Sequence, residues 1–387
     1  MRNSTDPVPT AGIGQEVSSP GMARGLGADK AGEGKYIQAY FDNTKSASCV
    51  FLHRPTVLSK WSQGKLDPIL LKALCAAGRR FLEGVDNDLV QAWMHEARLS
   101  ILARLNKFSL SRLQALVLMI QFYLRNGDTV EAWNLMSLAA RFAFTLRLNY
   151  ERPDLDPLTQ ESHRRLFWAI YLLDRLFSSG TEDLSLCHLE RIHIRLPCDD
   201  RSFERGIVSR AEYFKREEGT EASGMDPLAY LIRLYECREK ILIHTKQVRR
   251  QGISPAAMAD TQAALQEELD QFEVSLPDHL QYRAESLAIL AYSADAHSFF
   301  LIRTIWLQCH CDLYRFFVPG IRESVSSTVT ANTPVEYVDF CTDKCLSSAL
   351  KLCDFWTDML QLWTADLIEE TLVDEPRFAD EPRLEGR

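Results

Sequence analysis

Five charged side chains stand within one short apolar stretch of the sequence, ESHRRLFWAIYLLDR. They are Glu161, Arg164, Arg165, Asp174 and Arg175. Arginine pairs with carboxylates and also binds other anions, so the stretch could form ion pairs or hold an anionic ligand. On a helix, Glu161 would pair with Arg164 at i,i+3 and with Arg165 at i,i+4. Three arginines against two acids leave a surplus cation that a small anionic effector could use instead, and the sequence leaves both interpretations open.

The stretch that carries these charges has the pattern of an interior helix. Leu166, Ile170 and Leu173 share one helical face, and Trp168 lies almost opposite, so apolar residues surround the helix axis. We therefore expect a buried helix over residues 160–178, whose last charged residues reach groups on neighbouring helices. In such a helix, removing one member of an ion pair would strand the other.

Helical periodicity dominates the chain from Leu66 onward. Asp67 and Pro68 have the types expected for an N-cap and a first helical position. Asp128 is a second N-cap, and it follows a helix stop at Asn126 and Gly127. Alternating strand patterns are almost absent, so the sequence predicts an all-α fold of packed helix pairs with long irregular connections. Later helices are expected over 160–178, 226–250, 255–275, 284–317 and 335–365.

Composition divides the chain into three parts. Residues 1–34 are rich in Gly, Ser, Pro and Ala, which predicts a disordered lead-in. Residues 35–365 form the predicted helical domain, with a break at Pro55 and a mobile loop at about 320–334. Residues 366–387 mix acidic and hydrophobic side chains, a composition typical of activation segments and equally of a solvated tail.

Charge and hydropathy limit the classes of function. The 387 residues carry a net charge of −9, so the chain as a whole should repel nucleic acid and anionic membranes. The sequence has no apolar run of about 18 residues and no hydrophobic signal-peptide core, so we expect a protein inside the cell without membrane attachment. Its ten cysteines would then be mostly reduced.

Motifs for catalysis and metal binding are missing from the sequence. It contains no glycine-rich phosphate loop, no nucleophile elbow and no zinc-protease helix. The densest thiol clusters are Cys309 with Cys311 and Cys341 with Cys345; they lack the matched pairs of a zinc site, and we interpret them as core residues. We therefore expect no catalytic residue, no metal and no cofactor, although an enzyme without a recognised motif remains an alternative.

Several segments, taken in order, resemble the regulatory middle homology region of fungal zinc-cluster transcription factors. The family pattern places an Ala-Trp helix before a helix that starts Glu-x-Arg-Arg-Arg-x-Phe-Trp and ends Asp-Arg, and Leu-Pro follows after an irregular connection. The resemblance covers roughly residues 35–320. The matching positions are Ala132, Trp133, Glu161, Arg164, Arg165, Phe167, Trp168, Asp174, Arg175, Leu196 and Pro197.

Two features of this sequence depart from the family pattern. His163 stands where arginine is frequent, and the segment after Arg175 reads SSGTEDLSL where Gly-Arg-Pro is common. The six closely spaced cysteines with which the family holds zinc and reads DNA have no counterpart here, and Cys49 is the first cysteine. We therefore expect any contact with DNA to be indirect.

The resemblance implies an all-α regulatory domain of a nuclear transcription regulator, which would control a metabolic or biosynthetic gene set through ligand or partner binding. The implied partners are other transcription regulators or coactivators, including a full-length relative with which the chain would heterodimerise. The alternative is a helical small-molecule sensor or scaffold that has lost its DNA role, located in the cytoplasm.

Overall fold

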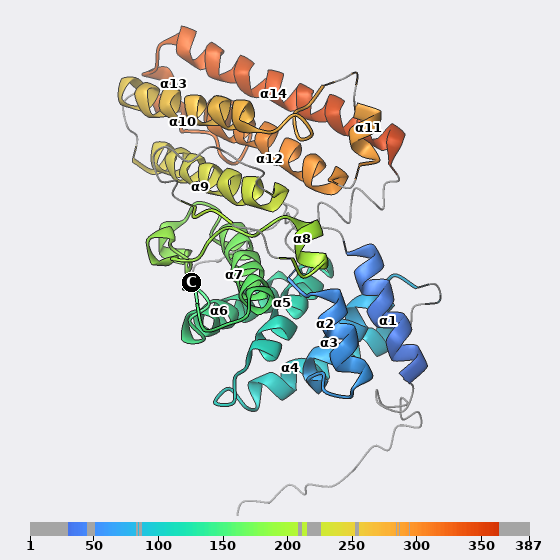
Figure 1. Ribbon diagram of the computed structural model, residues 1–387. Coiled ribbons are helices and arrows are strands. Elements are labelled where there is room, and N and C mark those ends of the chain that lie inside the picture. Colours follow the sequence, from blue (N-terminus) through green and yellow to red (C-terminus); the bar gives the residue numbers. More distant parts are fainter. Residues whose placement is uncertain are drawn as a thin grey trace, which may run out of the picture.

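The computed structural model describes residues 30–44, 51–82, 84, 87–207, 211–214, 226–251, 255–283, 285, 287–293 and 295–363. Within these ranges the regular elements are helices, and the extended contacts are two isolated bridges, Tyr150 with His193 and Arg195 with Tyr213. The predicted all-α class is confirmed. Figure 1 shows two stacked halves, the N-terminal one in blue and green and the C-terminal one in yellow and red.

The N-terminal half begins with six helices that pack on one another. Their starts follow from the capping residues that the sequence predicts: the Asp67 and Asp128 carboxylates accept hydrogen bonds from free N–H groups of the following turns. Gly127 takes a positive φ of 76° just after a helix end, a conformation open to glycine. The six helices are α1 (Lys30–Asn43), α2 (Arg54–Ser62), α3 (Pro68–Arg79), α4 (Asn87–Leu102), α5 (Leu110–Arg125) and α6 (Thr129–Thr145).

Helix α7 (Pro157–Ser178) is buried on nearly all sides, as its apolar pattern predicts. It packs against α5 and α6 on one side and against α9 (Pro227–Gln251) on the other. The chain between α7 and α9 is irregular apart from three short helical segments. These are η2 (Glu182–Leu184), η3 (Leu189–Arg191) and α8 (Asp200–Glu204).

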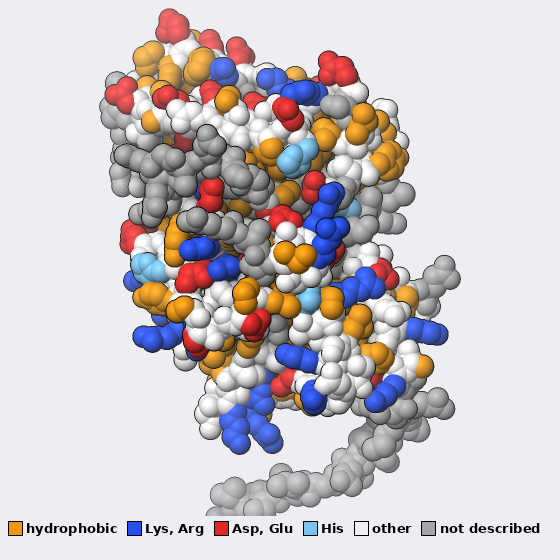
Figure 2. Space-filling model, viewed as in Figure 1, with side chains coloured by type: hydrophobic (Ala, Val, Ile, Leu, Met, Phe, Trp, Pro, Cys, Tyr) orange, Lys and Arg blue, Asp and Glu red, His pale blue; other side chains and the backbone are white. Residues whose placement is uncertain are grey.

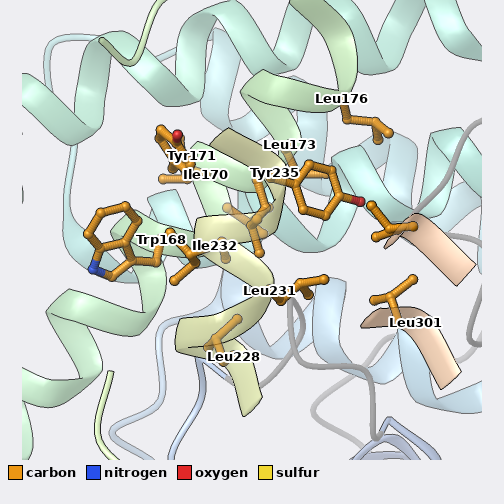
Figure 3. Close-up of a cluster of buried hydrophobic side chains, with 14 of the residues drawn as sticks. Trp168, Ile170, Tyr171, Leu173, Leu176, Leu228, Leu231, Ile232, Tyr235 and Leu301 are labelled. Carbon is orange, nitrogen blue, oxygen red and sulfur yellow. The ribbon is translucent and has the colours of Figure 1, made fainter. Parts of the chain in front are cut away.

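The C-terminal half is built around α12 (Ala296–Tyr314), which packs against α9, α10 (Pro255–Ser275) and α14 (Val335–Leu362). Apolar side chains of α7, α9 and α12 meet in one cluster, drawn in Figure 3, which joins the two halves of the molecule. The remaining elements of this half are α11 (Leu287–Ala291), η5 (Arg315–Phe317) and α13 (Ser327–Ala331).

The structure corrects two expectations near the N-terminus. Pro55 does not break the chain but lies in the first turn of α2, where a proline needs no N–H partner. Helix α1 begins at Lys30, within the segment 1–34 that was expected to be disordered, and residues 1–29 lie outside the described residues.

Two further corrections concern the C-terminal half. The single helix expected over 284–317 is divided into α11, α12 and η5, with a turn at Ser293 whose N–H donates to the Leu290 carbonyl. The loop expected at 320–334 contains α13, which the Ser326 hydroxyl caps. The tail at 366–387 lies outside the described residues.

The surface mixes charges of both signs. On the face drawn in Figure 2, acidic and basic side chains are interspersed over both halves. In the part of the chain that the structure describes, no helix is long and apolar enough to cross a membrane.

Candidate functional site

The charged residues of α7 form a buried network, and the local sequence fixes where that network begins. The Asp156 carboxylate caps the helix by accepting from the Thr159 N–H at 3.0 Å, and Pro157 occupies the first turn. This start places Glu161 and Arg165 one helical turn apart inside the protein, where both side chains have no solvent exposure.

Glu161 lies at the centre of the first half of the network. Its carboxylate accepts from the Arg164 and Arg165 guanidinium groups, each at 3.0 Å, which are the i,i+3 and i,i+4 contacts that the spacing predicts. It also accepts from the backbone N–H of Cys198 at 2.9 Å. The carboxylate therefore links its own helix to the irregular connection that follows.

Arg164 carries the network toward the segment before α7. Its guanidinium donates two parallel hydrogen bonds to Glu151, at 2.8 and 2.6 Å, in the fork geometry that suits arginine. Glu151 in turn accepts from the backbone N–H of Arg195 at 2.9 Å. Burial acts to raise the pKa of Glu151, but the hydrogen bonds from Arg164 and Arg195 outweigh it, and the pKa is lowered.

Arg165 is the most enclosed arginine of the network, with 1% of its surface exposed. Besides Glu161, it donates to the backbone carbonyl of Cys198 and to the Asp200 carboxylate, each at 2.5 Å. Its guanidinium also lies 4.4 Å from the centre of the Phe203 ring, a cation–π contact. One side chain thus fixes both the connection and the short helix α8.

Asp226 connects this cluster to α9. It accepts from the backbone N–H groups of Leu228 and Asp200, at 2.8 and 2.9 Å, and so caps α9 while holding the start of α8. Burial and the nearby Asp200 carboxylate raise the pKa of Asp226 to about 8, although the Arg165 guanidinium acts in the opposite direction.

Asp174 begins the second half of the network, at the other end of α7. Its carboxylate accepts from the backbone N–H of Leu186 at 3.1 Å, from that of Cys187 at 2.8 Å and from the Ser185 hydroxyl at 3.3 Å. Burial raises the pKa of Asp174, and these hydrogen bonds reduce that rise. The aspartate therefore binds the start of the connection much as Glu161 binds its later part.

Arg175 joins α7 to α9. It donates to the Cys187 carbonyl at 2.5 Å and lies 3.3 Å from the Glu239 carboxylate of α9. Glu239 also accepts from the N–H of Gly180 at 3.1 Å, and burial raises its pKa. A Cβ atom added to Gly180 would stand 2.4 Å from the Leu242 Cβ, so glycine allows the chain to pass this close to α9.

The aromatic residues of the predicted motif are on α7 or pack against it. Trp168 is fully buried and donates from Nε1 to the Arg195 carbonyl at 2.8 Å. Phe167 meets Phe144 of α6 edge to face at 5.7 Å, and Trp133 meets Phe177 at 5.5 Å. Of the other motif positions, Ala132, Leu196 and Pro197 are buried.

Sequence reasoning missed the acids that complete the network. Glu151, Asp200 and Glu239 lie outside the fifteen-residue stretch, and each contacts one of its arginines. With these partners included, each of the three arginines faces at least one carboxylate, so the surplus counted within the stretch does not extend to the folded protein. The anionic-effector hypothesis gains no support from these contacts.

Among the described residues, no three His, Cys, Asp or Glu side chains lie close enough together to hold a metal ion. An open hollow beside α1, α3 and α5 is lined by apolar residues together with Thr44, Arg80, Gln121 and Arg125. The α7 network is the larger and more enclosed arrangement of charge.

Comparison with known proteins identifies the family. A model described as the fungal specific transcription factor domain matches residues 37–279, a range that contains the entire α7 network. The chain belongs to this family. No solved structure matches this member of the fungal transcription factor domain family.

Curated relatives of this family member are named as transcriptional regulators. An uncharacterized transcriptional regulatory protein of Schizosaccharomyces pombe is 26% identical over 72% of this chain and 38% of its own length. The Zn(2)-C6 fungal-type transcription factor FTF2 of Fusarium oxysporum f. sp. lycopersici is 26% identical over 70% of this chain and 28% of its own length. The chain therefore spans less than half of the curated relatives that it matches.

Proposed function

We propose that this chain is a regulatory domain of a fungal transcription regulator and that it controls gene expression by binding partner proteins. The observation that carries the proposal is the family match over residues 37–279, together with relatives that are named as transcriptional regulators. The partners that fit this role are other transcription regulators or coactivators, including a full-length relative, and the location that fits it is the nucleus.

The α7 network supports a scaffold role within that function. It joins α7, the irregular connection and α9 through charged hydrogen bonds, and the apolar cluster of Figure 3 then joins α9 to α12. A domain tied together in this way presents its surface helices in fixed positions, which favours recognition by a partner protein. In this proposal the charges of α7 are structural and neither catalyse a reaction nor bind a ligand.

A tethering assay tests the regulatory role. The full chain is fused to an unrelated bacterial DNA-binding domain in fungal cells with a matching reporter gene. We expect reporter transcription to change relative to the DNA-binding domain alone, and we expect cross-linking in nuclear extract to recover other transcription regulators. An unchanged reporter together with no recovered regulator would contradict the proposal.

A DNA titration tests the proposed indirect contact with DNA. The net charge of −9 and the lack of six closely spaced cysteines in this sequence favour weak binding of DNA. We expect no saturable, sequence-dependent binding of the purified chain to promoter duplexes at physiological salt. Tight binding that survives competition from unrelated DNA would refute this part of the proposal.

Transcript measurements in a deletion strain test the kind of genes that the protein controls. They show whether the affected genes form a metabolic or biosynthetic set.

A further inference from the structure

Two cysteines face each other across the antiparallel helices α12 and α14. The direction of packing follows from side-chain contacts: Thr304 of α12 accepts from Trp356 at 3.0 Å, and Tyr314, ten residues later, meets Phe340 at 5.8 Å. Between these two contacts lie Cys311 on α12 and Cys345 on α14.

The two thiols reach across the helix interface reciprocally. Cys345 Sγ lies 3.7 Å from the Cys311 carbonyl oxygen, and Cys311 Sγ lies 4.0 Å from the Cys345 carbonyl oxygen. The thiols are also hydrogen-bonded to each other. Each thiol therefore lies beside the backbone of the facing cysteine, which places the two side chains as neighbours across the helix interface.

The surroundings of the pair differ from those of the other cysteines in the same helices. Cys309 and Cys341 have no solvent exposure, whereas Cys345 is 8% exposed and Cys311 is half-buried, so a small oxidant can reach the pair. Cys353 of α14 points outward and is exposed.

The environment also separates the chemistry of the two thiols. The hydrogen bond from Cys311 lowers the pKa of Cys345 against the effect of burial, and Arg315 lowers it further. The same hydrogen bond, together with burial, raises the pKa of Cys311. Because the thiolate is the reacting form of cysteine, Cys345 is the thiol that would react first.

We propose that Cys311 and Cys345 are a reversible redox pair, which a peroxide converts into a disulfide between α12 and α14. The Cys345 thiolate attacks one peroxide oxygen, the O–O bond breaks, and water leaves after protonation of the second oxygen, which gives a sulfenic acid. The Cys311 sulfur then attacks the sulfenic sulfur, the S–O bond breaks, and a second water leaves. In total, two thiols and one hydrogen peroxide give one disulfide and two waters, and a thiol reductant reverses the reaction.

The disulfide would change how firmly the last long helix is held. It would link positions 34 residues apart, with η5 and α13 inside the closed loop. Before oxidation, α14 is held on α12 only by noncovalent contacts such as the Trp356 hydrogen bond and the Cys pair. Oxidation would therefore couple the redox state of the cell to the opening of this helix pair.

Mass spectrometry of the full chain tests the pair. The reduced protein is treated with hydrogen peroxide. One part is measured intact without alkylation, and the rest is alkylated and digested for peptide mapping. We expect a mass loss of about 2 Da, one cross-linked peptide pair that contains Cys311 and Cys345, and a melting temperature higher by several degrees, all reversed by dithiothreitol. Oxygen addition without this cross-link, or cross-links elsewhere, would overturn the proposal.

Serine variants provide the matched comparison. Cys311→Ser and Cys345→Ser should each abolish the cross-link and the rise in melting temperature, whereas Cys353→Ser, on the outer face of the same helix, should retain both. Circular dichroism first verifies that each variant is folded. Since peptide mapping of the unaltered chain identifies the cross-link directly, the proposal stays testable even when a serine variant fails to fold. Loss of the cross-link in Cys353→Ser would refute the assignment.

Discussion

Arg165→Met should destabilise the protein severely, because it removes one side chain that binds four different groups. Methionine fills a similar volume but donates no hydrogen bond. The Glu161 carboxylate, which has no solvent exposure, would lose one of its two arginines, and the Cys198 carbonyl would lose its donor. Removing one partner of a buried ion pair typically costs about 3–5 kcal/mol.

That loss translates into a measurable melting temperature. For a domain larger than about 200 residues, each kcal/mol shifts the melting temperature by about 2 °C, so the variant should melt roughly 6–10 °C lower. Far-UV circular dichroism during heating measures this shift, and urea unfolding measures the free energy. Arg54→Met is the matched control: its pair with Asp42 is well exposed, at 42% and 57%, and its removal should cost below about 1 kcal/mol.

A second variant decides whether the effect belongs to the pair. Glu161→Gln combined with Arg165→Met should cost less than the sum of the single variants, because the double variant no longer strands one member of this pair without the other. Strict additivity would refute the ion-pair reasoning. The structural role would be refuted altogether if Arg165→Met melted at the same temperature as the unaltered chain and lost only a response to an added anion.

Two further predictions concern residues that contact α9: Gly180, which lies against its side, and Asp226, which caps its start. Gly180→Ala should lower the free energy of unfolding, measured in urea, by roughly 2–4 kcal/mol, because φ is positive at this residue and the new Cβ would meet Leu242. Gly64→Ala is the control: φ is 67° there but no atom lies within 4 Å, so the substitution should cost only about 1 kcal/mol. Equal costs would contradict the steric argument. The Asp226 carboxyl binds a proton more tightly in the folded protein than in the unfolded chain, so the free energy of unfolding should fall as pH rises from about 4 to about 8. Asp226→Asn keeps the helix cap and should remove up to about 1.4 kcal/mol per pH unit of that decrease. A slope unchanged in the variant would contradict the raised pKa.

The parts of the fold that were predictable are those that local sequence determines. Apolar periodicity predicts α7, and Asp67 and Asp128 predict two helix starts, because the cap and the N–H groups that it binds are two or three residues apart. Pro55 shows the limit of such rules, since proline fits a first helical turn as well as a break. The division between α11 and α12 was missed because no proline or glycine marks it.

The partners in the site could not be predicted for a different reason. Glu161 and Arg165 are four residues apart, so their contact follows from helix geometry. Asp200 lies 35 residues from Arg165 in the sequence. Glu239 lies 61 residues from Ser178, and its carboxylate accepts a hydrogen bond from the Ser178 hydroxyl. Contacts at these separations depend on how the connection folds back over α7, and no local spacing indicates that path.

The structure also explains why an interior helix carries five charges. Parts of the connection after α7 are buried, among them Ser185, Cys187 and Cys198. These parts form no regular strand or helix, so their backbone N–H and C=O groups need other hydrogen-bond partners. Side chains of α7 provide them: Asp174 binds N–H groups of the connection, Arg175 binds the Cys187 carbonyl, and Arg165 binds the Cys198 carbonyl.

This role distinguishes the network from a simple buried ion pair. Well-packed apolar residues can often replace such a pair without loss of stability, since both desolvated charges then disappear together. Here the same replacement would remove the charges but leave the backbone N–H groups of Cys187 and Cys198 buried and without their partners. Each stranded group would cost about 1–3 kcal/mol, and the costs accumulate along the connection. The charges of α7 are therefore required by the irregular path of the chain that covers them, and a shorter, helical connection would make them unnecessary.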